Sequence, residues 1–175
     1  MNEPYVLAVH GGAGTISPGV CAPEVESQYR RALHNAVAAG EAVLVAGGSA
    51  IDAVTASVVF LENCPLFNAG HGAVFTAEGK HELDASIMDG RTLRAGAASC
   101  VRTVRNPVLL ARAIMEDSGN VLLTADGADA YARECGLELV DPAYLSTPER
   151  HAQLLRARED ARGARLDHDA ATEAT

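Results

Sequence analysis

The sequence has little of several residues that particular classes of protein need. Tryptophan is absent, aromatic residues make up 4% of the chain, and Lys80 is the only lysine. With a formal net charge of −9 and scattered arginines, the chain lacks the clustered positive charge that neutralises phosphates. We therefore expect no nucleic-acid partner. The core must be built mainly from alanine, valine and leucine, which allow layers to pack closely.

Several catalytic signatures are also missing. No H-E-x-x-H pair, G-x-S-x-G elbow or Gly-Lys-Ser/Thr phosphate loop occurs, so neither a zinc hydrolase, a serine hydrolase of that type nor a nucleotide site is indicated. The cysteines form no C-x-x-C pair, which argues against a zinc knuckle and a disulfide framework. We expect four reduced, mostly buried thiols, at Cys21, Cys64, Cys100 and Cys135.

The sequence shows no signal-peptide pattern and no apolar run of membrane-spanning length, so we expect a cytoplasmic protein with no membrane partner. Its length of 175 residues, 48% of them hydrophobic, suits one domain with a sizeable core. After Gly163 the sequence has few apolar residues and no hydrophobic periodicity. We therefore expect one structured unit at 1–163 and a flexible tail at 164–175.

Hydrophobic periodicity predicts a mixture of helices and strands. Ser49 and Asp52 form a capping box, Asp89-Gly90 is a hairpin signal, and Asn106-Pro107 is a capped helix start. The predicted elements, in chain order, are a buried strand at 5–9, helices at 24–46 and 49–62, strands at 73–76, 82–88 and 93–104, a helix at 106–117, a strand at 121–123 and helices at 128–134 and 147–162.

The loop at 63–75 is the most distinctive stretch of the chain. Its glycines permit backbone angles closed to other residues, and carbonyl groups turned inward round such a loop suit a hard monovalent cation. Asn68 is the one polar side chain among small or apolar neighbours. An ordinary connecting loop is the alternative. A second glycine-rich segment, at 10–14, follows the first predicted strand and could present free N–H groups to an anion or an oxyanion.

Three polar residues between the predicted strands allow two interpretations. Asp84, Ser86 and Asp89 could form a metal or acid–base cluster if the turn brought them together. Strand alternation places Asp84 and Ser86 on one face while Asp89 lies in the turn. We therefore favour structural hydrogen bonding for these side chains.

Five segments, in the same order and at similar spacing, resemble the α subunit of plant-type L-asparaginases, also called isoaspartyl peptidases. The resemblance runs from about Tyr5 to Arg162. The segments are Val9-His10-Gly11-Gly12-Ala13-Gly14, Gly48-Ser49-Ala50-Ile51-Asp52-Ala53-Val54, Leu61-Glu62-Asn63-Cys64-Pro65-Leu66-Phe67-Asn68-Ala69-Gly70-His71-Gly72, Glu82-Leu83-Asp84-Ala85-Ser86-Ile87-Met88-Asp89-Gly90 and Arg105-Asn106-Pro107.

The resemblance implies an α/β (α+β) fold, the αββα four-layer sandwich of N-terminal-nucleophile hydrolases, completed by a separate β subunit. In that family a precursor cuts itself before a threonine, which then attacks the side-chain amide of L-asparagine or the β-aspartyl bond of an isoaspartyl dipeptide. The threonine's own α-amine can act as its general base. The only Gly-Thr here is Gly14-Thr15, so the nucleophile and the substrate-binding residues are expected on the β subunit, in an (αβ)2 assembly.

Carried over by position, the resemblance implies a structural sodium ion and no organic cofactor. Asn68 would lie beside the nucleophile, and the segment His10, Gly11 and Gly12 would lie beneath it, both as supporting groups. The backbone carbonyls that would bind sodium belong to Leu61, Glu62, Cys64, Phe67, Ala69 and His71.

Two further functions stay open at the level of the sequence. A glycosylasparaginase or a threonine endopeptidase would share the same fold, and the residues that select the substrate are not among those matched. A non-catalytic domain that binds an ion or a small molecule is the alternative from another class. It would be preferred if this chain were stable and soluble without a second polypeptide.

Overall fold

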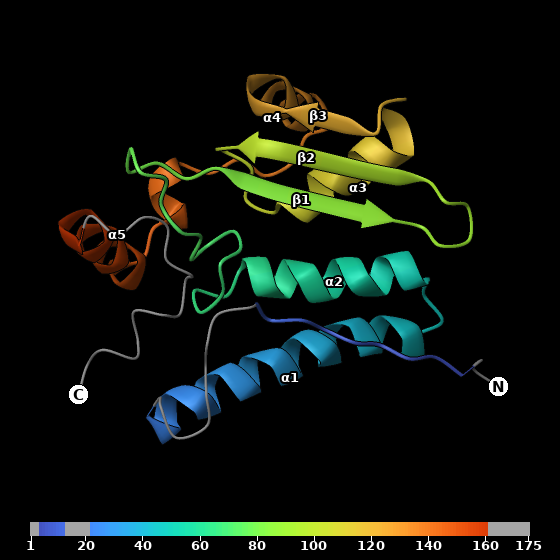
Figure 1. The fold of residues 1–175 in the computed structure, drawn as a ribbon. Helices are drawn as coiled ribbons and strands as arrows, with labels where there is room; N and C mark the ends of the chain where they lie inside the picture. Colours follow the sequence, from blue (N-terminus) through green and yellow to red (C-terminus); the bar gives the residue numbers. More distant parts are fainter. Residues whose placement is uncertain (1–3, 13–21, 161–175) are drawn as a thin grey trace.

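The computed structural model describes residues 4–12 and 22–160 (Figure 1), so the predicted tail at 164–175 and Cys21 lie outside the described residues. Helices and a small sheet together agree with the predicted α+β class. The elements are α1 (Pro23–Val45), α2 (Ala50–Glu62), β1 (Leu83–Met88), β2 (Ala95–Val101), α3 (Pro107–Asp117), β3 (Leu122–Thr124), α4 (Ala125–Glu134), the 3-10 helix η1 (Pro142–Leu145) and α5 (Pro148–Asp160).

Helices α1 and α2 begin and end where the local sequence predicts. Gly47 follows α1 with a φ of 84°, a conformation that glycine adopts without strain. Helix α2 starts with the predicted capping box: the Asp52 N–H donates to Ser49 Oγ at 3.1 Å, and the Ser49 N–H donates to the Asp52 carboxylate at 3.2 Å. The two helices then pack against each other as an antiparallel pair (Figure 1).

Small residues let α1 and α2 approach closely. A Cβ atom added at Gly40 of α1 would lie 2.3 Å from Ser57 Oγ and 2.8 Å from the Ala53 carbonyl oxygen of α2, so no larger residue fits. Ala36, one turn earlier on α1, is fully buried. The alanine-rich composition therefore serves helix–helix contact, as the sequence predicts.

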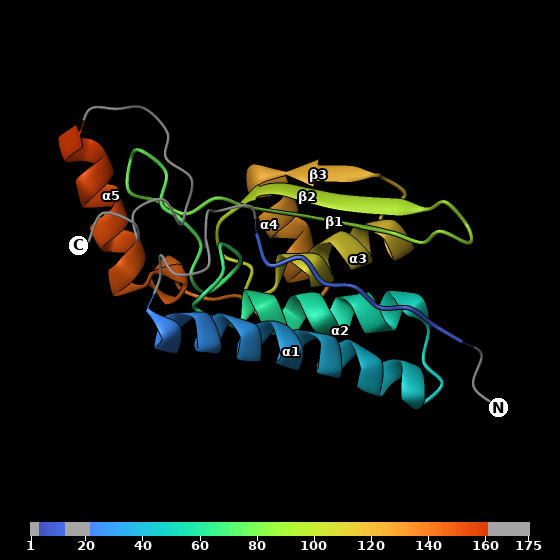
Figure 2. The same cartoon turned by 60° about the horizontal axis from the view of Figure 1, so that its bottom comes forward.

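The sheet has the order β1-β2-β3, with β1 antiparallel and β3 parallel to β2. The predicted hairpin is confirmed: Met88 pairs with Ala95, and the turn between them closes with a hydrogen bond of 2.9 Å from the Asp89 N–H to the Arg94 carbonyl. Helices α3 and α4 cover one face of the sheet, α2 packs on α3, and α1 lies beyond α2 (Figure 2).

The other face of the sheet is not covered by any element of the described chain (Figure 2). It carries Ser86 and Met88 of β1, Ala97 of β2 and Leu122 of β3; Ala97 pairs with Ser86 on one side and with Leu122 on the other. Met88 is 55% exposed and Leu122 is 52% exposed. Asp84 lies on the same face of β1 and is exposed as well, so the open face carries small, apolar and acidic side chains.

The strand predicted at 5–9 is wrong for this structure. The segment is extended but forms no strand, and Val6 is 96% exposed. It runs across α1 and α2 instead (Figure 1), where the Tyr5 hydroxyl donates to the Glu41 carboxylate at 3.3 Å and Val9 packs against the α1–α2 core. A strand needs a hydrogen-bonded neighbour, and the described residues offer none beside this segment.

The strand predicted at 73–76 is also absent, and the second strand of the hairpin is shorter than its predicted range, 93–104. Backbone groups at 73–76 bond within the loop and its turn: the Ala73 N–H donates to the Gly70 carbonyl and the Thr76 N–H to the Lys80 carbonyl. Leu93 has a φ of 59° and belongs to the turn. Local turns thus take the hydrogen bonds that a strand would need.

Two smaller predictions also need correction. Asn106 precedes α3 as predicted, but its side chain makes no capping hydrogen bond. The described cysteines are unpaired by disulfides, yet none is buried: Cys64 and Cys100 are partly exposed, and Cys135, which follows α4, is exposed.

None of the helices in the described part of the chain combines the length and hydropathy that a membrane crossing requires.

Candidate active site

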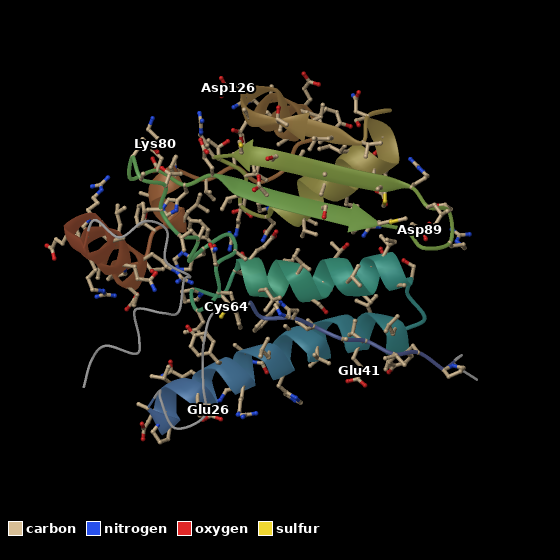
Figure 3. All side chains as sticks on the ribbon, viewed as in Figure 1. Glu26, Glu41, Cys64, Lys80, Asp89 and Asp126 are labelled. Atoms are coloured by element: carbon tan, nitrogen blue, oxygen red, sulfur yellow. The ribbon has the colours of Figure 1, made fainter. Side chains whose placement is uncertain are left out.

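The loop after α2 folds back onto the end of that helix. The His71 N–H donates to the Glu62 carbonyl oxygen at 2.7 Å, which brings the two ends of the loop together. The Gly72 N–H then donates to the Leu145 carbonyl at 3.0 Å, so η1 holds the far end of the loop. Figure 3 labels Cys64 in this loop, at the end of α2 opposite to the hairpin turn of Asp89.

Glycine is required at two positions of the loop. Gly70 has a φ of 50°, and a Cβ there would lie 2.3 Å from the Glu62 carbonyl oxygen. Gly72 has a φ of 111°, and its Cβ would lie 2.6 Å from the Pro65 oxygen and 2.9 Å from the Phe67 oxygen. Carbonyl groups therefore crowd both glycines, in a backbone conformation that other residues rarely adopt.

Phe67 anchors the loop to the helices. Its side chain is 3% exposed and meets the Tyr29 ring of α1 edge-on, with 5.8 Å between ring centroids. The Tyr29 hydroxyl donates to the Leu66 carbonyl at 3.1 Å. The next residue, Asn68, is exposed, and its side-chain oxygen accepts a hydrogen bond of 2.9 Å from the Val74 N–H. A rigid base thus presents one polar side chain to the surface.

The glycine-rich N-terminal segment meets the loop through Phe67. A Cβ at Gly11 would lie 3.1 Å from a ring carbon of Phe67 and 2.8 Å from a methyl group of Leu33. His10 is exposed, and its Nδ1 accepts from the Gly12 N–H at 3.2 Å. The structure therefore brings this segment to the residue next to Asn68, whereas the remainder of the glycine-rich segment, from Ala13 onward, lies outside the described residues.

The six predicted carbonyl ligands divide into two groups. Three of them accept backbone N–H groups: Leu61 from Cys64 at 3.1 Å, Glu62 from His71 at 2.7 Å and Cys64 from Phe67 at 3.4 Å. No backbone N–H within residues 4–12 and 22–160 donates to the carbonyls of Phe67, Ala69 and His71. Carbonyl oxygens have two lone pairs, so both groups keep capacity for a hard cation. Within the described chain no group of three histidine, cysteine or acidic side chains could hold a metal ion.

Glu62 has a second role that sequence reasoning missed. Its carboxylate is buried and accepts from the Val108 N–H at 2.9 Å and from Asn106 Nδ2 at 3.1 Å. Burial raises the pKa of the Glu62 carboxyl to about 7, against the opposing effect of these two hydrogen bonds. A sequence signal existed, because Thr55 and Glu62 are seven residues apart and so share the buried face of α2.

Arg150 is another supporting residue without a local sequence signal. It belongs to α5, is 5% exposed, and donates from Nε to the Gly72 carbonyl at 2.6 Å. His71 Nδ1 lies 2.6 Å from the Tyr144 carbonyl oxygen, and the centroids of the His71 and Tyr144 rings are 5.0 Å apart. The far end of the loop is therefore fixed by η1 and α5, from residues more than 70 positions away.

The two carboxylates of the hairpin make structural hydrogen bonds, as favoured from the sequence, whereas no hydrogen bond joins the Ser86 side chain to another described residue. Asp84 accepts from Ser99 Oγ at 2.7 Å and from the Cys100 N–H at 2.8 Å. Asp89 accepts from the Arg91 N–H at 2.9 Å and from Thr92 Oγ1 at 2.8 Å, and these bonds lower the pKa of its carboxyl. The described partners of both carboxylates lie in the hairpin and not in the loop that carries Asn68.

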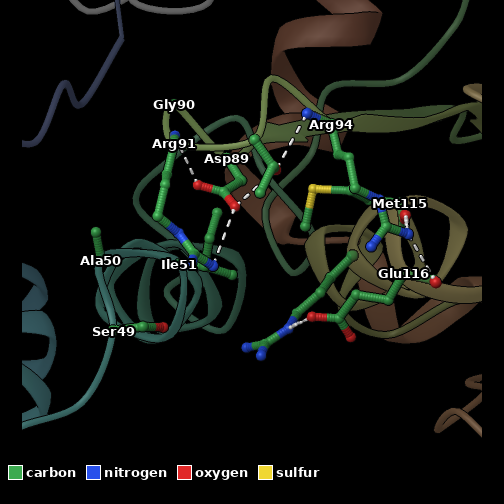
Figure 4. Close-up of a pocket in the computed structure, with 11 residues that line it drawn as sticks. Ser49, Ala50, Ile51, Asp89, Gly90, Arg91, Arg94, Met115 and Glu116 are labelled. Atoms are coloured by element: carbon green, nitrogen blue, oxygen red, sulfur yellow. Dashed lines mark hydrogen bonds and ion pairs between the residues drawn. The ribbon is translucent and has the colours of Figure 1, made fainter.

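A cleft of about 590 Å³ lies at the opposite end of α2, between the hairpin turn and α3 (Figure 4). Its arginines are engaged in protein contacts: Arg112 pairs with Asp52 at 2.7 Å and with Glu116 at 2.9 Å, and Arg94 donates to the Met115 and Glu116 carbonyls. Because α2 separates this cleft from the loop, we place the candidate site at the loop.

The chain matches a family model and several curated proteins. A family model described as asparaginase matches residues 3–175. The chain is 51% identical over 171 residues to an isoaspartyl peptidase of Salmonella typhimurium, 98% of this chain and 54% of that protein. It is 49% identical over 166 residues to an isoaspartyl peptidase of Escherichia coli, 95% of this chain and 51% of that protein.

An isoaspartyl peptidase/L-asparaginase of Rattus norvegicus is 45% identical over 160 residues, which cover 91% of this chain and 46% of that protein. The chain thus spans about half the length of the curated relatives that it matches. A match over nearly the whole chain at such identity shows common descent. The chain belongs to the asparaginase family.

Proposed function

We propose that this chain is the α part of an autoprocessed amidohydrolase that converts L-asparagine to L-aspartate and ammonia and cleaves β-aspartyl dipeptides. The observation that carries the proposal is the identity of 45–51% to isoaspartyl peptidases, one of them also named an L-asparaginase, over more than nine-tenths of this chain. The relatives' further length leaves room for a β subunit that begins with the nucleophilic threonine.

In the proposed reaction the threonine hydroxyl attacks the carbonyl carbon of the substrate's side-chain amide. The threonine's α-amine takes the hydroxyl proton and returns a proton to the departing ammonia or amino acid. Water then hydrolyses the aspartyl ester and regenerates the hydroxyl. Donors near the carbonyl oxygen stabilise the negative charge that develops there.

In that scheme this chain holds supporting groups in place beside the nucleophile and does not itself break the bond. Asn68, the one polar group that the rigid loop presents, would contact the nucleophile or its immediate neighbours. The segment from His10 to Gly12 would support it from below, since Gly11 already packs on Phe67. The exposed face of the sheet would pack against a second sheet from the β subunit, which gives the four-layer αββα sandwich and, in pairs, an (αβ)2 assembly.

A sodium ion would be held by the loop carbonyls of Leu61, Glu62, Cys64, Phe67, Ala69 and His71. The carbonyls that accept no described backbone N–H support this assignment, and so do the glycines that allow carbonyl groups to converge. Backbone ligands need no particular side chains, so the varied residues at these positions are compatible with a hard cation. The ion would keep the loop in one conformation.

The test uses the complete protein that carries this chain. We expect the purified protein to separate into two fragments on a denaturing gel, the second starting with threonine by N-terminal sequencing. It should release aspartate from L-asparagine and from a β-aspartyl dipeptide, while residues 1–175 produced alone should release none. An uncleaved protein, or one that hydrolyses only glycosylated asparagine or α-peptide bonds, would contradict the proposal.

A further inference from the structure

The carboxylate of Glu62 ties the end of α2 to the start of α3. Its Oε1 accepts from the N–H of Val108, the second residue of α3, at 2.9 Å. This is the bond that a capping side chain would provide, and Asn106, which occupies the cap position, does not provide it. Instead Asn106 Nδ2 donates to Glu62 Oε2 at 3.1 Å. One buried carboxylate therefore caps a helix that begins 45 residues later in the chain.

The backbone of the same residue fixes the far end of the loop. The Glu62 carbonyl accepts the His71 N–H at 2.7 Å. Gly70 packs so tightly against this residue that an added Cβ would lie 2.3 Å from the Glu62 oxygen and 2.9 Å from the Glu62 Cβ. A movement of Glu62 must therefore be followed by Gly70 and His71. In the sequence, Asn68 lies between Glu62, at the end of α2, and the two contacting residues Gly70 and His71.

The neighbouring residue strengthens the same junction. Asn63 Oδ1 accepts from Arg105 Nε at 3.2 Å, and Asn106 Nδ2 lies 3.5 Å from the same oxygen. Two consecutive residues at the end of α2 are thus held by two consecutive residues before α3. Since Glu62 is 3% exposed, water has little access to replace its bonds if they are lost.

We propose that the Glu62 side chain is a positioning residue for catalysis: by capping α3 it fixes the loop from Asn63 to Val74, and with it Asn68. This goes beyond the carbonyl role assigned above and rests on the proposed function for its catalytic consequence. The residue touches neither substrate nor reacting atoms. It acts through the Glu62–His71 backbone bond and the packing of Gly70.

The experiment compares three substitutions in the complete protein. Glu62→Ala removes both acceptors, and Glu62→Gln keeps an acceptor for the Val108 N–H. Asp129→Ala is the matched control, because Asp129 is also buried and accepts from the Arg102 and Thr103 N–H groups, at 3.2 Å each, without contact to the loop. We would measure kcat, KM and amide hydrogen exchange of peptides covering 66–74, well below the melting temperature of each variant.

For Glu62→Ala we expect exchange in 66–74 to become at least about tenfold faster, because loss of the junction lets the loop open locally. The value of kcat should fall roughly tenfold to a hundredfold with KM within about threefold, since small displacements of a positioned group affect the transition state most. Glu62→Gln should stay within about threefold of the parent in both measurements. Asp129→Ala should change neither, even if it lowers the melting temperature.

Unchanged loop exchange in folded Glu62→Ala, or an equal effect of Asp129→Ala on the loop and on kcat, would overturn the inference. Should Glu62→Ala not fold, Asn106→Ala decides, because it removes one of the two donors to the same carboxylate and should shift both readouts in the same direction. If the parent hydrolyses neither substrate, the proposed function fails, and the exchange measurement still decides whether Glu62 positions the loop.

Discussion

The Val74 N–H donates a hydrogen bond of 2.9 Å to the side-chain oxygen of Asn68, six residues earlier. The Val74 carbonyl, on the other side of the same residue, lies 3.1 Å from His81 Nδ1. The amide group expected to face the nucleophile is therefore oriented by its own loop. Because the Asn68 side-chain oxygen accepts the Val74 N–H, the NH2 group of the same amide points outward.

This orientation predicts that two substitutions at Asn68 act differently. Asn68→Ala removes the acceptor of the Val74 N–H and should lower the free energy of unfolding by about 1 kcal/mol, while turnover falls by a larger factor. Asn68→Asp keeps an acceptor oxygen and should retain the parent melting temperature, yet it loses the outward NH2 donor and should also lose turnover. Thermal melts and kcat in the complete protein check both. Full activity of either variant would remove Asn68 from the site.

Gly70 and Gly47 form a matched pair, because both have positive φ but only one is crowded. Gly47, with a φ of 84°, has no atom within 4 Å of an added Cβ, whereas Gly70 would meet the Glu62 oxygen at 2.3 Å. We expect Gly47→Ala to lower the free energy of unfolding by about 1 kcal/mol, the cost of the left-handed conformation alone. Gly70→Ala should cost at least about 3 kcal/mol, because it adds overpacking to that cost. Denaturant unfolding of both variants measures the difference, and equal effects would disprove the crowding.

Local patterns in the sequence predicted the parts of the fold that local interactions decide. The capping box of Ser49 and Asp52, the end of α1 at Gly47 and the turn at Asp89 all depend on residues within a few positions, and all are confirmed. The resemblance that carried the family assignment is confirmed too. The site roles of Asn68 and of the carbonyls stay predictions.

What the sequence could not show depends on partners far away. Glu62 accepts a hydrogen bond from Val108, 46 positions away, and Arg150 donates one to Gly72, 78 positions away. Hydrogen bonds at such separations produce no periodic pattern in the sequence. The strand predicted at 5–9 has the right composition but no neighbour among the described residues. On the function proposed above, a strand of the β subunit would be that neighbour.

Cys100 is a strained residue that predicts a stabilising substitution. It lies in β2 with a φ of 55°, opposite an irregularity in the pairing of β1, and its N–H donates to Asp84 at 2.8 Å. Glycine adopts this conformation without the steric cost of a Cβ and keeps the N–H. We expect Cys100→Gly to raise the free energy of unfolding by about 1 kcal/mol. Ser99→Gly, at the adjacent position, is the control and should lower it; a lower melting temperature for Cys100→Gly would contradict the strain.

His81 predicts how stability changes with pH. Its ring is buried, with Nδ1 toward the Val74 carbonyl and Nε2 2.9 Å from Ser146 Oγ. Burial lowers the pKa of His81, against a smaller opposing effect of the Val74 bond. The unfolded chain therefore binds a proton near pH 6.5 that the folded chain excludes, so stability should fall as pH drops below about 6.5, by at most about 1.4 kcal/mol per pH unit.

The measurement is the free energy of unfolding between pH 7.5 and 5 for the parent, His81→Gln and His34→Gln. His34 is exposed on α1 and serves as the control for loss of an imidazole. We expect His81→Gln to be less stable than the parent at pH 7.5 and to lose part of the parent's decline on acidification. His34→Gln should reproduce the parent curve. An identical decline in the parent and in His81→Gln would assign the pH dependence to other groups.

Removal of sodium should destabilise the loop if its carbonyls hold the ion. A ligand present at about 100 times its Kd stabilises the folded state by about 2.7 kcal/mol, so exchange of sodium for a bulky organic cation at constant ionic strength should lower the melting temperature of the complete protein. Cys64→Ala keeps the backbone carbonyl and should show the same sodium dependence. Gly70→Ala displaces the Glu62 carbonyl, so its melting temperature should depend little on sodium. A parent melting temperature that ignores sodium, with metal analysis confirming its removal, would exclude a stabilising ion at this loop.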